Sequence, residues 1–400
     1  MTHERRQPLA GKRVLEAGGY LAAPFAAHIL SQLGAEVIKL EALQGDPTRT
    51  MVNGGPGGTF IAYGYGKQSL ALDLASEAGQ RVLQRLLPSV DIVVHNLSPQ
   101  AARKLALDAA SCHSLNSALV HCHIRGYGDG PRAEEVASNP IVEAATGAMF
   151  ANRVNGRPER LGPSYQDMFA GMNAVIGILG AVMSGREREC VEIGLYETGL
   201  HVAARDLVGA AATRGSSAAG PAEFAHPGYG AYRTSDDRWI YLLLLSDQHW
   251  VRFCEMSALP EGSAPDLQTR KQRQAQGARV EAAVRDCVAR HTYDDLALKL
   301  QDAGLGFTEV LPPERVLDDP QARVAGKVAP VDYLGRTYQV AGYPLSPMPA
   351  KAALPLLGGD SLRILQAIGF SAADCEAMLR DGVLKAPQEH HPTTDSETRA

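Results

Sequence analysis

Hydrophobic and polar positions in the first part of the chain group into short blocks that predict strands and helices in alternation. Apolar runs typical of buried strands cover residues 12–17, 35–41, 69–74, 91–95 and 118–124. Apolar residues at helical spacing between them predict helices over 22–32, 76–87 and 99–107. Strand, helix and strand in succession form parallel pairs with right-handed crossovers. The pattern therefore predicts a large, Rossmann-like doubly wound α/β domain.

The composition of the chain shifts after this region and indicates a second domain. Residues 210–225 are rich in alanine, glycine and serine, which is typical of a linker. After it, shorter apolar runs predict strands near 230–234 and 239–245 and helices near 247–257, 270–291 and 293–303. The expected parts are a large domain over 1–209, a linker over 210–225, a small α+β domain over 226–329, a return segment over 330–387 that completes the large domain, and a disordered tail over 388–400.

One predicted helix is almost entirely apolar and carries a single carboxylate at its start. Residues 168–183 hold no charged side chain, and three glycines thin one side of the helix. Ser164, directly before the helix, suits an N-cap. Two interpretations of Asp167 stay open. It is either a first-turn carboxylate favoured by the helix dipole, or a reactive group that a large molecule can approach across the glycine-thinned surface.

Composition and charge narrow the class of protein. A hydrophobic content of 45% with 21% charged residues is ordinary for a globular protein, and a net charge of −5 without a dense basic run argues against nucleic-acid binding. Six scattered cysteines without a CxxC pair indicate reduced thiols rather than disulfides or a zinc site. The N-terminus lacks the apolar core of a signal peptide, and no apolar run approaches the ~20 residues that span a bilayer. We therefore expect a soluble cytoplasmic protein without a membrane segment.

A doubly wound domain suggests a nucleotide ligand, but the glycine motifs for one are missing. The Gly18-Gly19 pair after the first strand lacks the GxGxxG spacing of dinucleotide sites. Residues 66–69 are like the end of a phosphate-binding loop, yet Ile61 occupies the position of its first glycine. Neither a dinucleotide site nor an ATP site is predicted.

A series of short motifs runs through nearly the whole chain. They cover residues 9–15, 24–41, 45–49, 67–73, 96–99, 126–128, 167–171, 229–234, 314–320 and 362–369. In order and spacing, these motifs resemble the family III (CaiB/BaiF) CoA-transferases, a group that includes formyl-CoA transferase, carnitine CoA-transferase and α-methylacyl-CoA racemase.

The resemblance implies an activity. In this family, the aspartate that matches Asp167 is the covalent nucleophile when CoA moves from an acyl-CoA to a free carboxylic acid. A carboxylate can attack a thioester carbonyl and expel the CoA thiolate, which returns to form an aspartyl-CoA thioester. The resemblance also implies acyl-CoA and small carboxylic acids as substrates, no permanently bound cofactor or metal, and an interlocked homodimer.

The resemblance further implies CoA contacts in the large domain. They match residues 41–43, Lys67, Leu72, Asn96, Leu97, Arg103 and Lys104. Lysine and arginine at these positions would pair with the phosphates of CoA. Arg103 and Lys104 could equally form the solvated face of a helix, and Asn96 could simply end a strand.

Three positions depart from the family pattern. Leu21 stands where formyl-CoA transferase has a glutamine, and Ala42 replaces an arginine used for CoA. The catalytic histidine of the racemase branch falls here at Ser138, beside Asn139. A racemase or isomerase that works by proton transfer stays the alternative, with that histidine missing. A third possibility, a non-catalytic CoA-binding subunit, is disfavoured because Asp167 is present.

Overall fold

The structure, a computed structural model, describes residues 7–53, 55–135, 137–185, 188–212, 226–324, 326–349 and 352–387. Its contacts divide the chain into two units, one over 1–207 with 323–400 and the other over 208–322. The predicted linker at 210–225 lies mostly outside the described residues, and the predicted tail at 388–400 lies wholly outside them. The chain re-enters the first unit at residue 323, before the predicted boundary at 330.

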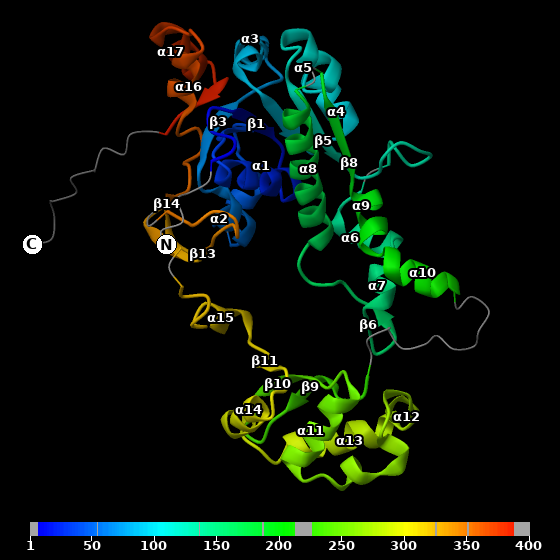
Figure 1. Ribbon diagram of the computed structural model, residues 1–400. Coiled ribbons are helices and arrows are strands. Elements are labelled where there is room, and N and C mark those ends of the chain that lie inside the picture. The colour runs from blue at the N-terminus through cyan, green and yellow to red at the C-terminus, as the bar shows by residue number, and fades with distance from the viewer. Residues whose placement is uncertain are drawn as a thin grey trace, which may run out of the picture. The chain divides into compact units, whose positions relative to one another are not determined.

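A seven-stranded sheet forms the centre of the first unit (Figure 1), with strand order β15-β3-β2-β1-β4-β5-β8. The strands are β1 (Arg13–Ala17), β2 (Glu36–Glu41), β3 (Lys67–Leu72), β4 (Ile92–His95), β5 (Val120–Arg125), β8 (Cys190–Gly194) and β15 (Leu384–Lys385). All neighbouring pairs are parallel except β15 with β3. The predicted doubly wound α/β fold is confirmed.

Successive strand residues point to opposite sides of this sheet, so both of its faces carry apolar side chains. Helices cover and bury both faces. Val14 of β1 belongs to one core, with α1 (Ala22–Gln32), α8 (Tyr165–Ser184) and α9 (Leu195–Val202). The next residue, Leu15, belongs to the other core. The helices of that second core are α3 (Glu77–Leu86), α5 (Ala109–Leu115), α16 (Ser361–Ala367) and α17 (Ala372–Arg380), and α4 (Pro99–Lys104) lies in the chain between its residues Leu97 and Leu105.

The return segment adds a small sheet to the first unit. Its strands are β12 (Val328–Tyr333), β13 (Arg336–Ala341) and β14 (Ala352–Ala353), which pack against α2 (Gly58–Gly64). Shorter elements complete the unit: the 3-10 turn η1 (Pro47–Arg49), α6 (Asn139–Ala145), α7 (Ala148–Ala151), β6 (Arg153–Val154) and β7 (Arg157–Pro158). Helix α10 (Ala204–Ala212) runs across the boundary at residue 207.

Helix α8 is long and apolar enough, by length and composition, to cross a membrane. From the sequence we expected no membrane-spanning segment. Core helices of soluble proteins share this property, so length and composition decide little here. One side of α8, including Ala170, Ala174 and Ile178, is buried in the core that it shares with α1.

The second unit is built around a three-stranded antiparallel sheet of β9 (Tyr229–Arg233), β10 (Trp239–Leu243) and β11 (Phe307–Glu309). Its helices are α11 (Asp247–Ser257), α12 (Arg270–Ala275), α13 (Gly277–Val288), α14 (Tyr293–Asp302) and α15 (Pro313–Val316). Trp250 and Phe253 of α11 are fully buried in its core beside Val284 of α13. This arrangement is the small α+β domain that the sequence pattern predicts.

Candidate active site

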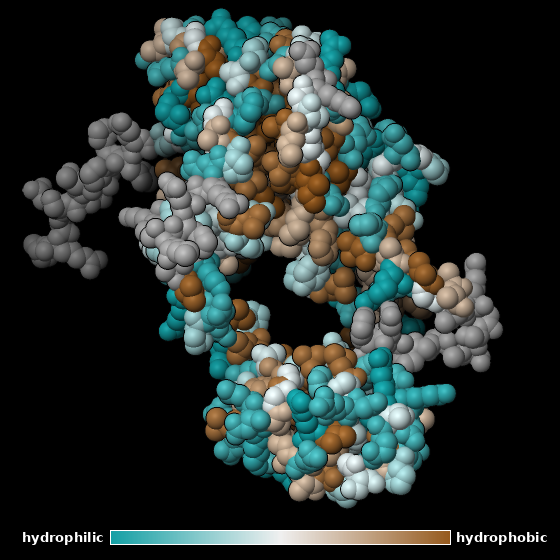
Figure 2. Space-filling view, viewed as in Figure 1, coloured by the Kyte–Doolittle hydropathy of each residue, from teal (hydrophilic) through white to brown (hydrophobic). Residues whose placement is uncertain are grey.

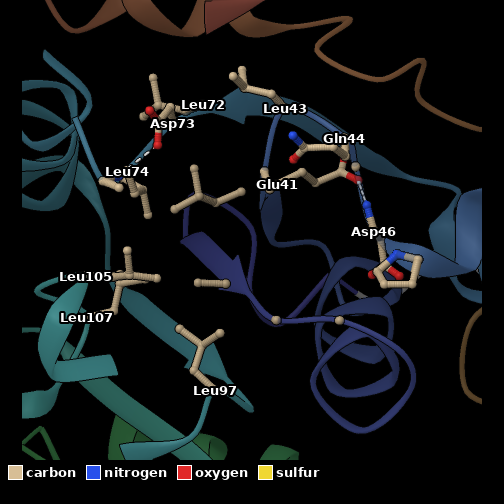
Figure 3. Close-up of a pocket in the computed structure, with 18 residues that line it drawn as sticks. Glu41, Leu43, Gln44, Asp46, Leu72, Asp73, Leu74, Leu97, Leu105 and Leu107 are labelled. Atoms are coloured by element: carbon tan, nitrogen blue, oxygen red, sulfur yellow. Dashed lines mark hydrogen bonds between the residues drawn. The ribbon is translucent and has the colours of Figure 1, made fainter. Parts of the chain in front are cut away.

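A cavity of about 500 Å³ lies at the carboxyl ends of β1, β2, β3 and β4 (Figure 3). Its walls are the segments that follow these strands: residues 17–19, 40–47 and 72–75, together with Leu97, Leu105 and Leu107. The strand order reverses between β1 and β4. Open α/β sheets bind their ligands at such a reversal, on the carboxyl side of the strands.

Leucine side chains dominate the walls of this cavity. Figure 3 shows Leu97, Leu105 and Leu107 on one side and Glu41, Gln44 and Asp46 on the other. Among the described residues that line it, none is lysine or arginine. The cavity therefore suits an uncharged or aromatic part of a ligand and offers no cationic side chain to a phosphate group.

Six of the predicted CoA-binding residues lie at this cavity, and three of them are residues 41–43 of its wall. Leu72 and Leu97 form part of its wall. Asn96 follows β4 and binds the loop after β1: its Oδ1 accepts from the Gly19 N–H at 3.1 Å, and its Nδ2 donates to the Gly19 carbonyl at 2.9 Å. Asn96 therefore holds the two loops together across the strand reversal, which is more than ending a strand.

The predicted basic contacts lie elsewhere. Arg103 and Lys104 occupy the last turn of α4, just before the wall residue Leu105, and are exposed. The guanidinium of Arg103 lies 4.0 Å from Glu134. The ammonium of Lys67 is buried and donates to Glu16 Oε2 at 2.6 Å and to the Pro24 carbonyl at 2.8 Å. These partners occupy Lys67, so its predicted CoA contact is corrected to an internal ion pair.

Lys67 belongs to a buried ion network behind the cavity wall. Lys39 Nζ lies 2.6 Å from Glu16 Oε1 and 2.8 Å from Asp46 Oδ2. Asp46 also caps η1, since its Oδ1 accepts from the Thr48 N–H at 2.9 Å. Because Asp46 lines the cavity, this network fixes the shape of the wall.

A second set of buried charges ties the same wall to the return segment. Arg49 binds Glu41 with two hydrogen bonds, from Nε to Oε1 at 2.7 Å and from Nη2 to Oε2 at 2.6 Å. Its Nη1 donates to the Tyr333 hydroxyl at 3.2 Å and to the Pro355 carbonyl at 2.9 Å. The Asp46 N–H donates to Glu41 Oε1 at 3.0 Å and joins the two sets. These contacts give the sequence Asp-Pro-Thr-Arg at 46–49 a structural role in the cavity wall.

Asp167 is the third residue of α8, as the sequence pattern predicts, but Ser164 does not cap this helix. The capping acceptor is Asn139, which lies on α6. Its Oδ1 accepts from the Gln166 N–H at 3.0 Å and from the Asp167 N–H at 3.3 Å. Asn139 is buried and so holds the start of α8 in one position.

Asp167 shares its surroundings with a second carboxylate. Glu143 is completely buried, accepts a hydrogen bond from Asn139 Nδ2, and lies 3.9 Å from Arg160 Nε. Burial and, after it, the charge of Glu143 raise the pKa of Asp167 to about 6, while Arg160 opposes the rise. Asp167 is therefore ionised near neutral pH but more basic than an exposed carboxylate.

The helix that carries Asp167 lies tightly against α1. A Cβ atom added to Gly171 would lie 2.9 Å from the Ala22 carbonyl oxygen and 2.9 Å from a ring carbon of Phe25. Ala22 begins α1, and Gly19, three residues earlier, lines the cavity. One short loop thus adjoins both the cavity and the helix of Asp167.

Comparison with known proteins decides the family. A family described as CoA-transferase family III matches residues 9–361. The chain belongs to this family. It is 28% identical over 333 residues to succinyl-CoA–D-citramalate CoA-transferase of Chloroflexus aurantiacus, covering 78% of this chain and 81% of the relative. It is 27% identical over 347 residues to succinate–glutarate CoA-transferase of Agrobacterium fabrum, covering 80% and 84%.

A solved structure agrees with this assignment. A CaiB/BaiF family protein from Brucella suis superimposes with a TM-score of 0.77 and 25% identity, over 91% of this chain and all of the other. The predicted resemblance is confirmed, and the chain is an enzyme of the CoA-transferase type that acts on CoA thioesters. Within the described residues, no group of three or more His, Cys, Asp or Glu side chains suits a metal ion.

Proposed function

We propose that this family III CoA-transferase moves CoA from an acyl-CoA to a free carboxylic acid through a covalent intermediate on Asp167. The observation that carries the proposal is the position of Asp167: a half-buried carboxylate of raised basicity at the start of α8, one turn before Gly171, where this helix meets the start of α1 next to the cavity loop. A raised pKa increases the nucleophilicity of the carboxylate, yet leaves it ionised at pH 7.

The exchange needs no outside reagent. An Asp167 oxygen attacks the thioester carbonyl, the carbon–sulfur bond breaks, and the CoA thiolate leaves behind a mixed anhydride. The thiolate then attacks the aspartyl carbonyl and releases the first acid as its carboxylate. The acceptor carboxylate attacks the resulting aspartyl-CoA thioester, and the thiolate finally takes the new acyl group and frees Asp167. One thioester and one carboxylate are present both before and after the exchange, so the reaction is nearly isoenergetic. Correct positioning of the reacting groups therefore supplies most of the catalysis.

The alternative, an isomerase that works by proton transfer, fits the site less well. Such an enzyme needs two acid/base groups on opposite sides of a carbon atom. Asn139, next to the position of the racemase histidine, cannot exchange a proton, and its amide is used to hold Asp167 and Glu143. Glu143 itself is fully buried. A transferase also requires a second, free acid, which an isomerase does not.

We infer that CoA lies with its uncharged parts in the leucine-rich cavity and its phosphates toward Arg103 and Lys104. Both basic side chains are exposed and immediately precede the wall residue Leu105. Phosphate groups bind exposed cations of this kind at the rim of an apolar site.

The acid substrate is proposed to carry two carboxyl groups. The acids in the names of the two relatives above, citramalate, succinate and glutarate, all do. Arg160 is the cation whose charge acts on Asp167, and its side chain is 48% exposed. A guanidinium in this position suits the distal carboxylate of such an acid.

We propose that the protein is a cytoplasmic homodimer, as its family membership implies. An apolar stripe on α8 supports a second copy as the occupant of this surface: Phe169, Met172 and Ile176 lie at helical spacing and are 36%, 43% and 67% exposed. Figure 2 shows hydrophobic side chains gathered over α1 and α8. A well-folded, active monomer in sedimentation at micromolar concentration would contradict the dimer.

A trapping experiment tests the covalent mechanism. We expect that succinyl-CoA without an acceptor leaves an adduct on the peptide that carries Asp167, and that hydroxylamine removes it, because that amine attacks both anhydrides and thioesters. An acceptor labelled with oxygen-18 should leave label in the Asp167 carboxylate. Sustained CoA transfer without any adduct or label on this peptide would overturn the proposal.

A further inference from the structure

The loop between β1 and α1 contains a residue in an unfavourable backbone conformation. Tyr20 has a φ of 62°, in the left-handed region that bulky L-residues rarely adopt. The two preceding residues are glycines, for which no such restriction exists, yet the chain places its left-handed turn on the tyrosine.

Packing does not explain this conformation. The Tyr20 side chain is 58% exposed, so it gains little from burial. The loop around it, in contrast, is held on both sides. On one side, Asn96 makes two hydrogen bonds to Gly19, and Lys39 Nζ donates to the Gly18 carbonyl at 3.2 Å. On the other side, the Leu21 carbonyl accepts from the Phe25 N–H of α1 at 2.7 Å. Unfavourable conformations that the surroundings enforce occur preferentially at functional sites.

The position of Tyr20 relates this loop to the reaction. Gly18 and Gly19 line the CoA cavity, and Ala22 lies against α8 one turn beyond Asp167. Only Tyr20 and Leu21 separate these two contacts in the chain. Tyr20 therefore lies in the short segment that connects the cavity wall to the residue packed against the helix of Asp167.

A small recess beside the cavity also involves this side chain. Tyr20 lines it together with Asp46, which is a wall residue of the cavity as well. The recess and the cavity therefore share the wall residue Asp46, and Tyr20 lines the recess.

We propose that Tyr20 contacts the acyl-CoA and that its phenolic hydroxyl donates a hydrogen bond to the carbonyl oxygen of the reacting acyl group. Attack by Asp167 turns this carbonyl oxygen into an oxyanion, and a donor fixed in advance stabilises that charge more than it stabilises the neutral thioester. The hydroxyl keeps its proton throughout. This role rests on the transferase function proposed above.

Two substitutions at this position separate contact with the substrate from a merely structural role. Tyr20→Phe keeps the backbone and the ring but loses the donor, so kcat for CoA transfer from succinyl-CoA to glutarate should fall about 100-fold with KM and Tm unchanged. Tyr20→Gly also relieves the backbone, so Tm should rise by about 1–2 °C while kcat falls at least as far.

A matched control lies in the turn between β12 and β13. Leu334 also has a left-handed φ, of 48°, and is 70% exposed. Leu334→Gly should raise Tm like Tyr20→Gly and leave kcat unchanged. Wild-type kcat in Tyr20→Phe would overturn the inference, whatever the result for Tyr20→Gly. The transferase function is judged separately, by the adduct on Asp167 in the wild-type protein, so either idea can fail while the other stands.

Discussion

Among the described residues of the first unit, acidic and basic side chains meet away from solvent in two places, and the two places are built differently. Behind the cavity wall, Glu16, Glu41 and Asp46 face Lys39, Lys67 and Arg49, so that three acids meet three bases, and every side chain in these pairs is at most 4% exposed. At the start of α8, two carboxylates, Asp167 and Glu143, meet one arginine whose side chain is 48% exposed.

The difference shows how the same chemical groups serve structure or reaction. Burying an ion costs several kcal/mol, and paired hydrogen bonds offset this cost only where every charge has partners. The first site meets this condition and holds the wall in one shape. The second leaves Asp167 short of positive charge, which raises its pKa to about 6 and makes its carboxylate more reactive.

The largest expected effect comes from removing the charge of Asp167. Asp167→Asn should lower turnover at least ~1,000-fold, because an amide oxygen is a far weaker nucleophile than a carboxylate. The folded protein should not lose stability. The pKa of Asp167 is higher in the folded state than its ordinary 3.8, so this group destabilises the fold increasingly as the pH rises from about 4 to 6.

At pH 7 the Asn variant should therefore be more stable than wild type, on the order of 1 kcal/mol, as measured by urea unfolding. If Asp167 served only the helix start, Asn would replace it in an active enzyme. A fully active Asp167→Asn variant would thus remove the basis for the contrast between the two sites.

The fully paired site should respond in the opposite way. Glu16→Gln leaves Lys39 and Lys67 with less negative charge around them, and breaking a buried pair in this way costs about 3–5 kcal/mol. Unfolding in urea measures the loss. Glu36→Gln is the matched control, because its ion pair with Arg13 is partly exposed and should contribute less than about 1 kcal/mol. Equal losses in both variants would contradict the structural role of the network.

Local patterns in the sequence identify most elements of the fold correctly. The helices predicted over 22–32 and 247–257 have the bounds of α1 and α11 in the structure. Apolar periodicity and a clear start or stop signal fix such helices without help from distant residues. α5 was missed because Cys112 is its one buried residue, and the helix predicted over 270–291 divides at Gln276 into α12 and α13.

The site residues that sequence reasoning placed wrongly or missed depend on distant partners. In the sequence, Lys67 has no acidic residue next to it that would indicate an ion pair, because its partner Glu16 lies 51 residues earlier in the chain. Asn139 reaches the start of α8 from 27 residues before Gln166, so nothing local marks it as a helix cap. The uncharged, glycine-thinned helix drew attention to Asp167 but left two interpretations open, and the family motifs alone pointed to its role as nucleophile and to Leu72 as a CoA contact.

The proposed substrate class offers a smaller and more selective effect. Arg160→Gln should raise KM for glutarate about 10–30-fold, the loss of one charge-assisted contact, and leave KM for a monocarboxylic acid of similar length unchanged. Arg157→Gln is the matched control on the neighbouring β7, since the Arg157 side chain is 83% exposed. An equal rise in KM for both acids would mean that Arg160 supports Glu143 and does not bind the substrate.

The smallest expected effect concerns the second carboxylate at the start of α8. Because the reactive form of Asp167 is the carboxylate, kcat/KM should rise as the pH increases from 5 to 7 and level off above its pKa of about 6.

Glu143→Gln removes the charge that contributes to this raised pKa, so the rising limb should move to lower pH. At pH 5.5 the variant should then equal or exceed wild type a few-fold, while above pH 7 the less basic carboxylate should make it slightly slower. Glu143→Gln also removes the ion-pair partner of Arg160, the residue proposed to bind the acceptor. Both enzymes are therefore compared with the same acyl-CoA donor and a saturating concentration of acceptor. A pH profile that Glu143→Gln leaves in place would mean that burial alone sets the basicity of Asp167, and that the second carboxylate only holds Asn139.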